Sequence, residues 1–182
     1  MRRKCRPTVL TASAFLFVAL VSSVSGAGEN LVTNPGFEQV TESEDEVRGW
    51  NVPDMPGVNP LVAENAVHSG SRCVGVEGTD PSTQSRYVQA WRQNVSALPE
   101  RRLWFSVQVK CEALESGRIN ILHKDKDGTV LRNQGIAGFD GTHGWTEKGG
   151  VVELEPGTES LQIVMGLQKS TGRVWFDDVF LG

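Results

Sequence analysis

The sequence predicts an all-β protein built as a two-sheet antiparallel β-sandwich. Apolar and polar residues alternate with a period of two over several segments, and helical periodicity is nearly absent. Glycine- and proline-containing turn signals separate these segments at regular spacing. With 38% hydrophobic and 22% charged residues, the 182-residue chain has the composition of one ordinary globular domain.

The clearest strand pattern lies in residues 103–111, where every odd-numbered position from Leu103 to Cys111 is apolar. Residues 161–167 alternate in the same way. Shorter runs lie at 119–123, 151–154 and 174–181. Turns are expected at Asn34-Pro35-Gly36, Ser69-Gly70, Leu98-Pro99, Ser116-Gly117, Asp127-Gly128, Pro156-Gly157 and Thr171-Gly172. This spacing predicts eight to ten strands, with no internal repeat and no second domain.

Residues 1–27 have the pattern of a secretory signal peptide. A basic segment, 1–6, precedes the uncharged residues 9–24, and small residues follow at 22–27. The sixteen uncharged residues are fewer than the roughly 20 that a membrane-spanning helix needs. We expect cleavage after Ala27, with Gly26 as the alternative position, and a mature domain, 28–182, that is secreted to the periplasm or the extracellular space and is not bound to a membrane.

The charge of the mature chain limits its partners. Residues 1–27 contain four basic and no acidic residues, so their removal changes the formal net charge from −4 to −8. An acidic domain does not favour phosphate backbones or anionic membranes, so nucleic acid is not an expected partner. Neutral ligands and divalent cations are compatible with this charge.

Two cysteines remain after cleavage, Cys73 and Cys111. Export permits a disulfide between them. Strand parity points the other way, because Cys111 continues the apolar face of its strand whereas Cys73 alternates with Val74 and Val76. A bridge between the sheets and two buried free thiols both remain open.

Four segments of the sequence, taken in order, carry a family resemblance. They are residues 30–38 with Gly49-Trp50, residues 67–71, residues 91–95 with the strand 103–111, and residues 144–147 with 174–179. This arrangement resembles the secreted carbohydrate-binding modules of the galactose-binding-domain-like jelly-roll superfamily, in particular the CenC-like modules of families four, nine and twenty-two. The resemblance spans residues 30–182 and implies non-catalytic binding of a polysaccharide or oligosaccharide.

The resemblance also implies a structural Ca²⁺ ion. Modules of this type often hold calcium where the first and last strands meet, which transfers the site to Glu38 and Asp177, with Asp178 as a further ligand. Carbonyls near Ser69 and Gly70 could complete the six to eight oxygen ligands that Ca²⁺ takes. The alternative is that Asp177 and Asp178 only form hydrogen bonds within a turn.

Candidate sugar-binding residues are aromatic side chains with polar neighbours, because flat rings stack on the apolar faces of sugars. On the strand around residues 87–93, Tyr87, Gln89, Trp91 and Gln93 share one face, which combines two aromatic rings and two amides. Core packing is the alternative role for each ring.

A second candidate platform lies on the strand 103–111, where Trp104 is on the polar face together with Gln108. His123 and Gln168 are candidates for lining the same groove. Structural roles are expected for Trp50, Trp145 and Trp175.

No catalytic motif is present in the sequence. The three histidines, His68, His123 and His143, are isolated, and neither zinc-ligand spacing nor a Gly-x-Ser-x-Gly elbow occurs. The expected function is therefore non-catalytic. The alternatives are a secreted structural or adhesive protein that binds another protein and, less favoured, a small glycan-active enzyme.

Overall fold

The computed structural model describes residues 28–41, 46–84, 89–96 and 98–182. The predicted signal peptide and Tyr87 lie outside the described residues. The strands in this part of the chain are β1 (Val58–Ala63), β2 (Cys73–Gly78), β3 (Gln89–Ser96), β4 (Arg102–Lys124), β5 (Val130–Glu153), β6 (Ser160–Leu167) and β7 (Gly172–Leu181). Within these residues no helix has the length and apolar character that crossing a membrane requires.

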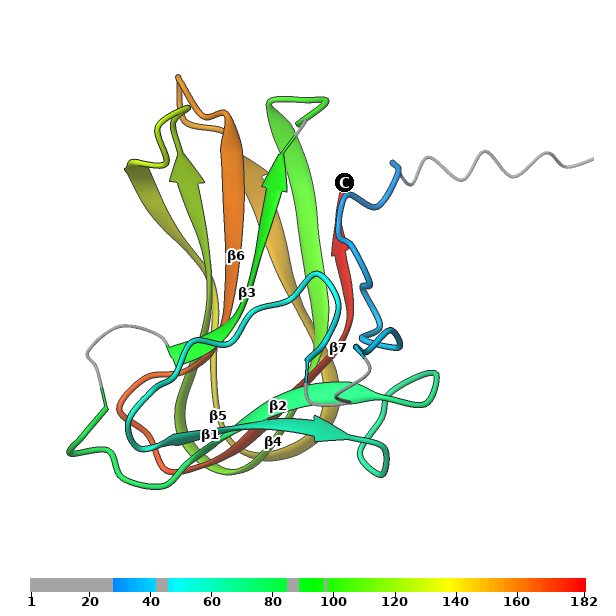
Figure 1. Cartoon of the computed structure of the whole chain (residues 1–182), viewed down its shortest axis with the longest axis vertical. Coiled ribbons are helices and arrows are strands. Elements are labelled where there is room, and N and C mark those ends of the chain that lie inside the picture. The colour runs from blue at the N-terminus through cyan, green and yellow to red at the C-terminus, as the bar shows by residue number, and fades with distance from the viewer. Residues whose placement is uncertain (1–27, 42–45, 85–88, 97) are drawn as a thin grey trace, which may run out of the picture.

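The strands form two layers that share the β4–β5 hairpin (Figure 1). In sheet I the order is β1-β2-β7-β4-β5, with β7 paired to Phe105–Glu112 of β4. In sheet II the order is β3-β6-β4-β5, with β6 paired to Gly117–Lys124 of β4. All of these pairs are antiparallel, so the predicted all-β antiparallel sandwich is confirmed.

The two sheets are continuous because β4 and β5 bend together where they pass from one layer to the other. The β4–β5 register shifts between Val109 and Cys111, between Cys111 and Leu114, and again before Gly117. Such bulges bend a strand and increase its twist. The prediction of a turn at Ser116-Gly117 is therefore wrong, and the described residues contain fewer and longer strands than the eight to ten expected.

Gly117 allows the hairpin to close tightly at this bend. A Cβ atom at this position would overlap the ring of Phe139 on β5 and would also crowd Leu114. The Phe139 ring is 7% exposed and makes an edge-to-face contact with Phe176, at 6.0 Å between centroids. The small residue thus leaves room for an aromatic pair that joins β5 to β7.

The core lies between the sheets and follows the predicted alternation. The odd-numbered side chains from Leu103 to Cys111 on β4, and Leu161, Ile163, Met165 and Leu167 on β6, are all buried. Beyond the bend, Ile119 and Ile121 of β4 continue the same core. Alternation predicted the buried face of both strands correctly.

The segment before β1 lies along the last strand, β7, and brings the two ends of the domain together (Figure 1). The backbone N–H of Leu31 donates to the carbonyl of Leu181 at 2.8 Å, and Val179 N–H donates to the carbonyl of Pro35 at 3.0 Å. The Asn30 amide adds two bonds to β7, because its Nδ2 donates to the carbonyl of Val179 and its Oδ1 accepts from the N–H of Leu181. These bonds place residues 30–38 beside the end of β7, as expected.

Cys73 and Cys111 are free and lie on opposite faces of sheet I. Cys111 belongs to the main core, whereas Cys73 packs with Ala66 and Trp175 in a small cluster on the outer face. Burial raises the pKa of each thiol to about 12. Of the two alternatives, the structure has buried thiols, and strand parity explains why.

Replacing Gly117 with alanine should lower the free energy of unfolding by about 1–3 kcal/mol, because the new methyl group must displace the packed Phe139 ring. Gly144→Ala is the matched control, since that glycine also lies in the hairpin and a Cβ atom there would meet nothing within 4 Å. Chemical denaturation of both variants measures the difference. Equal stabilities would show that the bend does not depend on Gly117.

Candidate functional site

The outer face of sheet II carries a groove of about 390 Å³. Strand register brings its side chains together from four strands: Asn94 lies opposite Gln162, which lies opposite Leu122, which lies opposite Asn133. The residues that line the groove are Arg92, Asn120, Leu122, Asn133, Gln162, Val164 and Gln168.

The floor of the groove is apolar. Val164, which is 6% exposed, packs against Leu122 at its centre. The neighbouring residues Gly135 and Gly166 have no side chains, so no side chain from these two positions covers the floor. An apolar floor of this kind suits a flat ligand with an apolar face.

Amide side chains surround this floor. Asn120, Asn133 and Gln162 line the groove, and Gln162 Nε2 donates to Asn94 Oδ1 at 3.0 Å. Each amide offers donors and an acceptor, which matches the dual character of a hydroxyl group. The arrangement can therefore hold a polyhydroxylated ligand by hydrogen bonds.

Arg92 is the charged residue of the groove lining. Its Nε atom is buried and has no hydrogen-bond partner among the described residues. Its backbone is fixed on both sides, because Arg92 lies opposite Val164 in the sheet and exchanges N–H···O bonds with Asn51. The groove therefore holds a cation in a well-defined position.

The expectation that Trp91 and Gln93 form an exposed binding face is wrong, since both side chains point into the core. Trp91 is 3% exposed and its Nε1 donates to the carbonyl of Gly75 at 2.8 Å. Gln93 is 5% exposed and its amide pairs with the backbone N–H and carbonyl of Thr33. The sequence carried a signal for this, because the buried Val95 has the same parity and polar residues occupy the alternate positions.

Tyr87 and Gln89 complete the predicted set on this strand. Tyr87 lies outside the described residues. The backbone of Gln89 begins β3 opposite Leu167, and its side chain lies outside what the structure describes. Their predicted binding roles stay predictions.

Trp104 is 46% exposed, as expected, and Gln108 on the same face is half-buried. Both lie on the outer face of sheet I, where Trp104 is opposite Val151 of β5. The sheet II groove opens on the other side of the sandwich. The structure therefore separates Trp104 and Gln108 from the groove instead of joining the two predicted platforms into one site.

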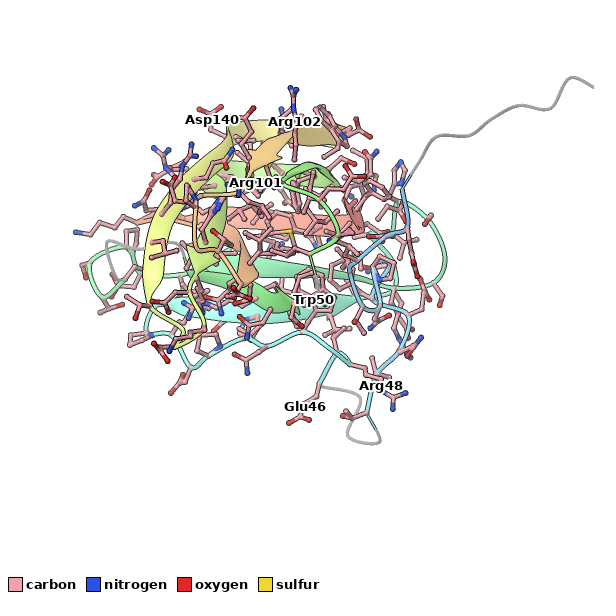
Figure 2. The ribbon with its side chains drawn as sticks, turned by 90° about the horizontal axis from the view of Figure 1, so that it is seen from above. Glu46, Arg48, Trp50, Arg101, Arg102 and Asp140 are labelled. Carbon is pink, nitrogen blue, oxygen red and sulfur yellow. The ribbon has the colours of Figure 1, made fainter. Side chains whose placement is uncertain are left out.

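The remaining candidates divide between the groove and the interior. Gln168 lines the sheet II groove and not the groove expected beside Trp104, whereas His123 is fully buried and lines neither. Trp50 and Trp175 are 7% and 8% exposed, and the half-buried Trp145 donates its Nε1 hydrogen to the carbonyl of Val67. These contacts fit the structural roles predicted for the three tryptophans. In Figure 2, Glu46 and Arg48 project outward from the segment that precedes Trp50.

The five residues predicted to bind calcium lie together at the junction of the N-terminal segment and β7. Gly36 is at the centre, since a Cβ atom there would lie 3.9 Å from carboxylate oxygens of Asp177 and Asp178 and from Cγ of Glu38. Gly70, with a φ of 62°, lies so close to Glu38 that a side chain would overlap its carboxylate. Glycine adopts this left-handed conformation without strain and leaves room for the Glu38 carboxylate.

Hydrogen-bond donors from residues 68–72 face these carboxylates. The N–H groups of His68 and Ser69 donate to Asp177 Oδ2 at 2.9 and 3.1 Å. The Ser69 hydroxyl donates to Asp178 Oδ1 at 2.7 Å, and His68 Nδ1 lies 2.6 Å from Asp178 Oδ2. The N–H groups of Ser71 and Arg72 donate to Glu38 Oε1. We call this arrangement of Glu38, Asp177, Asp178 and residues 68–72 the acidic clasp.

The acidic clasp contains ligand types that suit calcium, but its carboxylate oxygens accept hydrogen bonds from N–H and O–H groups. Carboxylate oxygens are ligands that Ca²⁺ prefers. Yet the described residues contain no group of three or more His, Cys, Asp or Glu side chains placed to hold a metal ion. Ser69, predicted to offer a carbonyl, contributes donors to the bonds that the structure shows.

Asp177 and Glu38 have opposite pKa shifts. Burial raises the pKa of the fully buried Asp177 carboxyl, against the effect of the N–H donors, and the neighbouring Asp178 charge raises it further. For Glu38, partial burial acts to raise the pKa, but the Ser71 hydroxyl and the N–H groups of Ser71 and Arg72 lower it overall. A nearby cation would stabilise the charged form of a buried carboxylate whose pKa is raised.

No family model matches the sequence, and no curated protein matches it. Among solved structures, the chain is similar to the xylan-binding domain CBM22-1 of Paenibacillus barcinonensis Xyn10C, with a TM-score of 0.61, 18% identity, and coverage of 85% of this chain and 94% of that one. It is also similar to the C-terminal family 22 carbohydrate-binding module of Clostridium thermocellum Xyn10B, with a TM-score of 0.56, 15% identity, and coverage of 82% and 94%.

The chain has the jelly-roll fold of these carbohydrate-binding modules. The predicted resemblance is thus confirmed at the level of the fold. A further likeness is to the enzymatically active domain of tailspike protein 4 from bacteriophage CBA120, with a TM-score of 0.58 and 14% identity over 84% of this chain. The chain spans only 21% of that protein, so this match concerns one domain of a larger molecule.

His123 should make the stability of the fold depend on pH. Its Nδ1 accepts the N–H of Glu155, its Nε2 bonds to Gln134, and burial lowers its pKa although the Gln134 bond opposes this. An unfolded histidine takes up a proton near pH 6.5, about its ordinary pKa. The unfolded state then binds more protons than the folded state, so the free energy of unfolding falls as the pH drops below that value.

Denaturation at a series of pH values between 7 and 5 measures this dependence. His123→Gln should flatten it, whereas His143→Gln, at a half-buried position outside the core, should retain the wild-type slope. An unchanged slope in the His123 variant would assign the pH dependence to other groups.

Proposed function

We propose that the protein binds polysaccharide without catalysis through the groove on the outer face of sheet II. The observation that carries the proposal is the combination of an apolar floor, Val164 with Leu122, and surrounding amides contributed by four registered strands. The similar Paenibacillus barcinonensis module is a xylan-binding domain, and the Clostridium thermocellum module binds ligand in a cleft. Xylan is therefore the first polysaccharide to test.

The composition of the groove supports binding rather than hydrolysis. Glycosidases commonly use two carboxyl groups placed about 5–10 Å apart on either side of the scissile bond. The described residues that line the groove include neither Asp nor Glu. They also include no aromatic side chain, so affinity should be modest, with dissociation constants of roughly µM to mM.

Replacing both Gln162 and Asn133 with alanine should weaken xylan binding about ten-fold, because each lost hydrogen bond contributes about 0.5–1.5 kcal/mol. Trp104→Ala, on the opposite face, is the control and should bind as the wild type does. Affinity electrophoresis or calorimetry measures the change, and reducing-sugar release from the same xylan should stay at background.

Three outcomes would contradict the groove proposal. Loss of binding in Trp104→Ala alone would move the site to sheet I. Sugar release by the wild type would favour the enzyme alternative. Retention of no polysaccharide, together with capture of a defined surface protein, would favour the adhesive alternative.

We also propose that the acidic clasp binds calcium. Support comes from the Asp177 and Asp178 carboxylates near Gly36 and from the burial of Asp177. Calcium would have to displace the N–H and hydroxyl donors that now hold these carboxylates. The clasp ties residues 30–38 to β7, so a bound cation would stabilise the junction of the two ends of the domain. The proposal includes the export of the mature domain, 28–182, which rests on the pattern of residues 1–27.

Added Ca²⁺ should raise the melting temperature of the purified mature domain, and a chelator should lower it, because a ligand that binds only the folded state stabilises it. The shift should disappear in Asp177→Asn and persist in Asp127→Asn, whose exposed carboxylate lies in the β4–β5 turn. An identical melting temperature with calcium and with chelator would show that the clasp is closed by hydrogen bonds alone.

A further inference from the structure

We propose that the groove selects polysaccharides that carry carboxylate groups, such as uronic-acid side chains, and that Arg92 binds the carboxylate. The inference rests on the proposed function and specifies its ligand class. It is carried by the unpartnered Nε of Arg92 and by the sign of the charge on this face of the molecule.

The charge of sheet II is opposite to that of the whole chain. Its four strand segments, 89–96, 117–124, 130–138 and 160–167, contain no Asp or Glu, although the sequence has 22 of them. The same segments contain Arg92, Arg118, Lys124 and Arg132. The strands of this face therefore carry positive charge on an acidic protein, and positive charge beside a groove attracts anionic ligands.

Parity places three of these cations on the groove side. Arg92 is in the same cross-strand row as Val164 and Asn120 of the groove. Arg118 and Lys124 lie on β4 two residues before and four residues after Asn120. They have the same parity as Asn120 and therefore face outward with it. Arg132, at the loop end, instead pairs with Glu155 at 3.7 Å. The described ion pairs include no partner for the other three.

The geometry at Arg92 calls for an acceptor. A buried N–H without a partner is rare in folded proteins and calls for an explanation. The guanidinium is planar, and its terminal N–H groups match the two oxygens of a carboxylate, so one ligand group can accept two hydrogen bonds from it. Neutral hydroxyl groups could accept these bonds but would leave the charge uncompensated.

The test compares one polysaccharide in two forms: a glucuronoxylan, and the same material after chemical reduction of its carboxyl groups. The wild type should bind the uronate form on the order of ten-fold more tightly, as a charge-assisted bond predicts. Added salt should reduce this difference. Arg92→Gln should abolish it, and Arg92→Lys should retain part of it because the charge remains without the planar fork.

Arg102→Gln is the matched control, since the Arg102 side chain is 71% exposed at the start of β4 (Figure 2) and should not affect the preference. Equal wild-type affinity for both forms would overturn the carboxylate inference and leave the proposed function intact, even if Arg92→Gln does not fold. Retention of neither form would refute both. Tighter binding of a sulfated xylan than of the uronate form would overturn the assignment to carboxylates.

Discussion

The bend in the β4–β5 hairpin is the constraint on which the rest of the structure depends. Two strands that would otherwise form one long flat ribbon cross from sheet I to sheet II through consecutive register shifts between Val109 and Gly117. Because bulges increase twist as well as bending the strand, the two halves of β4 join different neighbours, β7 in one sheet and β6 in the other. The core, the groove and the meeting of the chain ends all follow from this crossing.

Alternation along the strands then decides which side chains are available to a ligand. In β3 the residues Trp91 and Val95 fill the core, so Arg92 and Asn94 must face outward. In β6 the four odd-numbered positions from Leu161 to Leu167 belong to the main core, which leaves Gln162 and Val164 on the groove side. The groove is thus the reverse side of the core, and its chemistry is set by the residues that the core does not use.

The two candidate sites belong to different parts of the sandwich. The acidic clasp joins the N-terminal segment to β7 of sheet I, whereas the groove lies on sheet II. A cation at the clasp would act on the stability of the domain, and a ligand at the groove would contact a surface of opposite charge. This separation allows an acidic protein to combine carboxylates that suit a metal ion with an arginine that suits an anion.

The sequence by itself determined the fold class, the buried faces of β4 and β6, and the structural roles of three tryptophans, because alternation and turn residues are local properties. Its resemblance to a family brought Glu38 and Asp177 together correctly. Only the tertiary structure decided that residues 102–124 form one bent strand and that Arg92, Asn120 and Gln162 meet. A period of two is a property of a single strand, whereas a bend and a groove depend on which strands pair, and pairing joins residues that are far apart in the sequence.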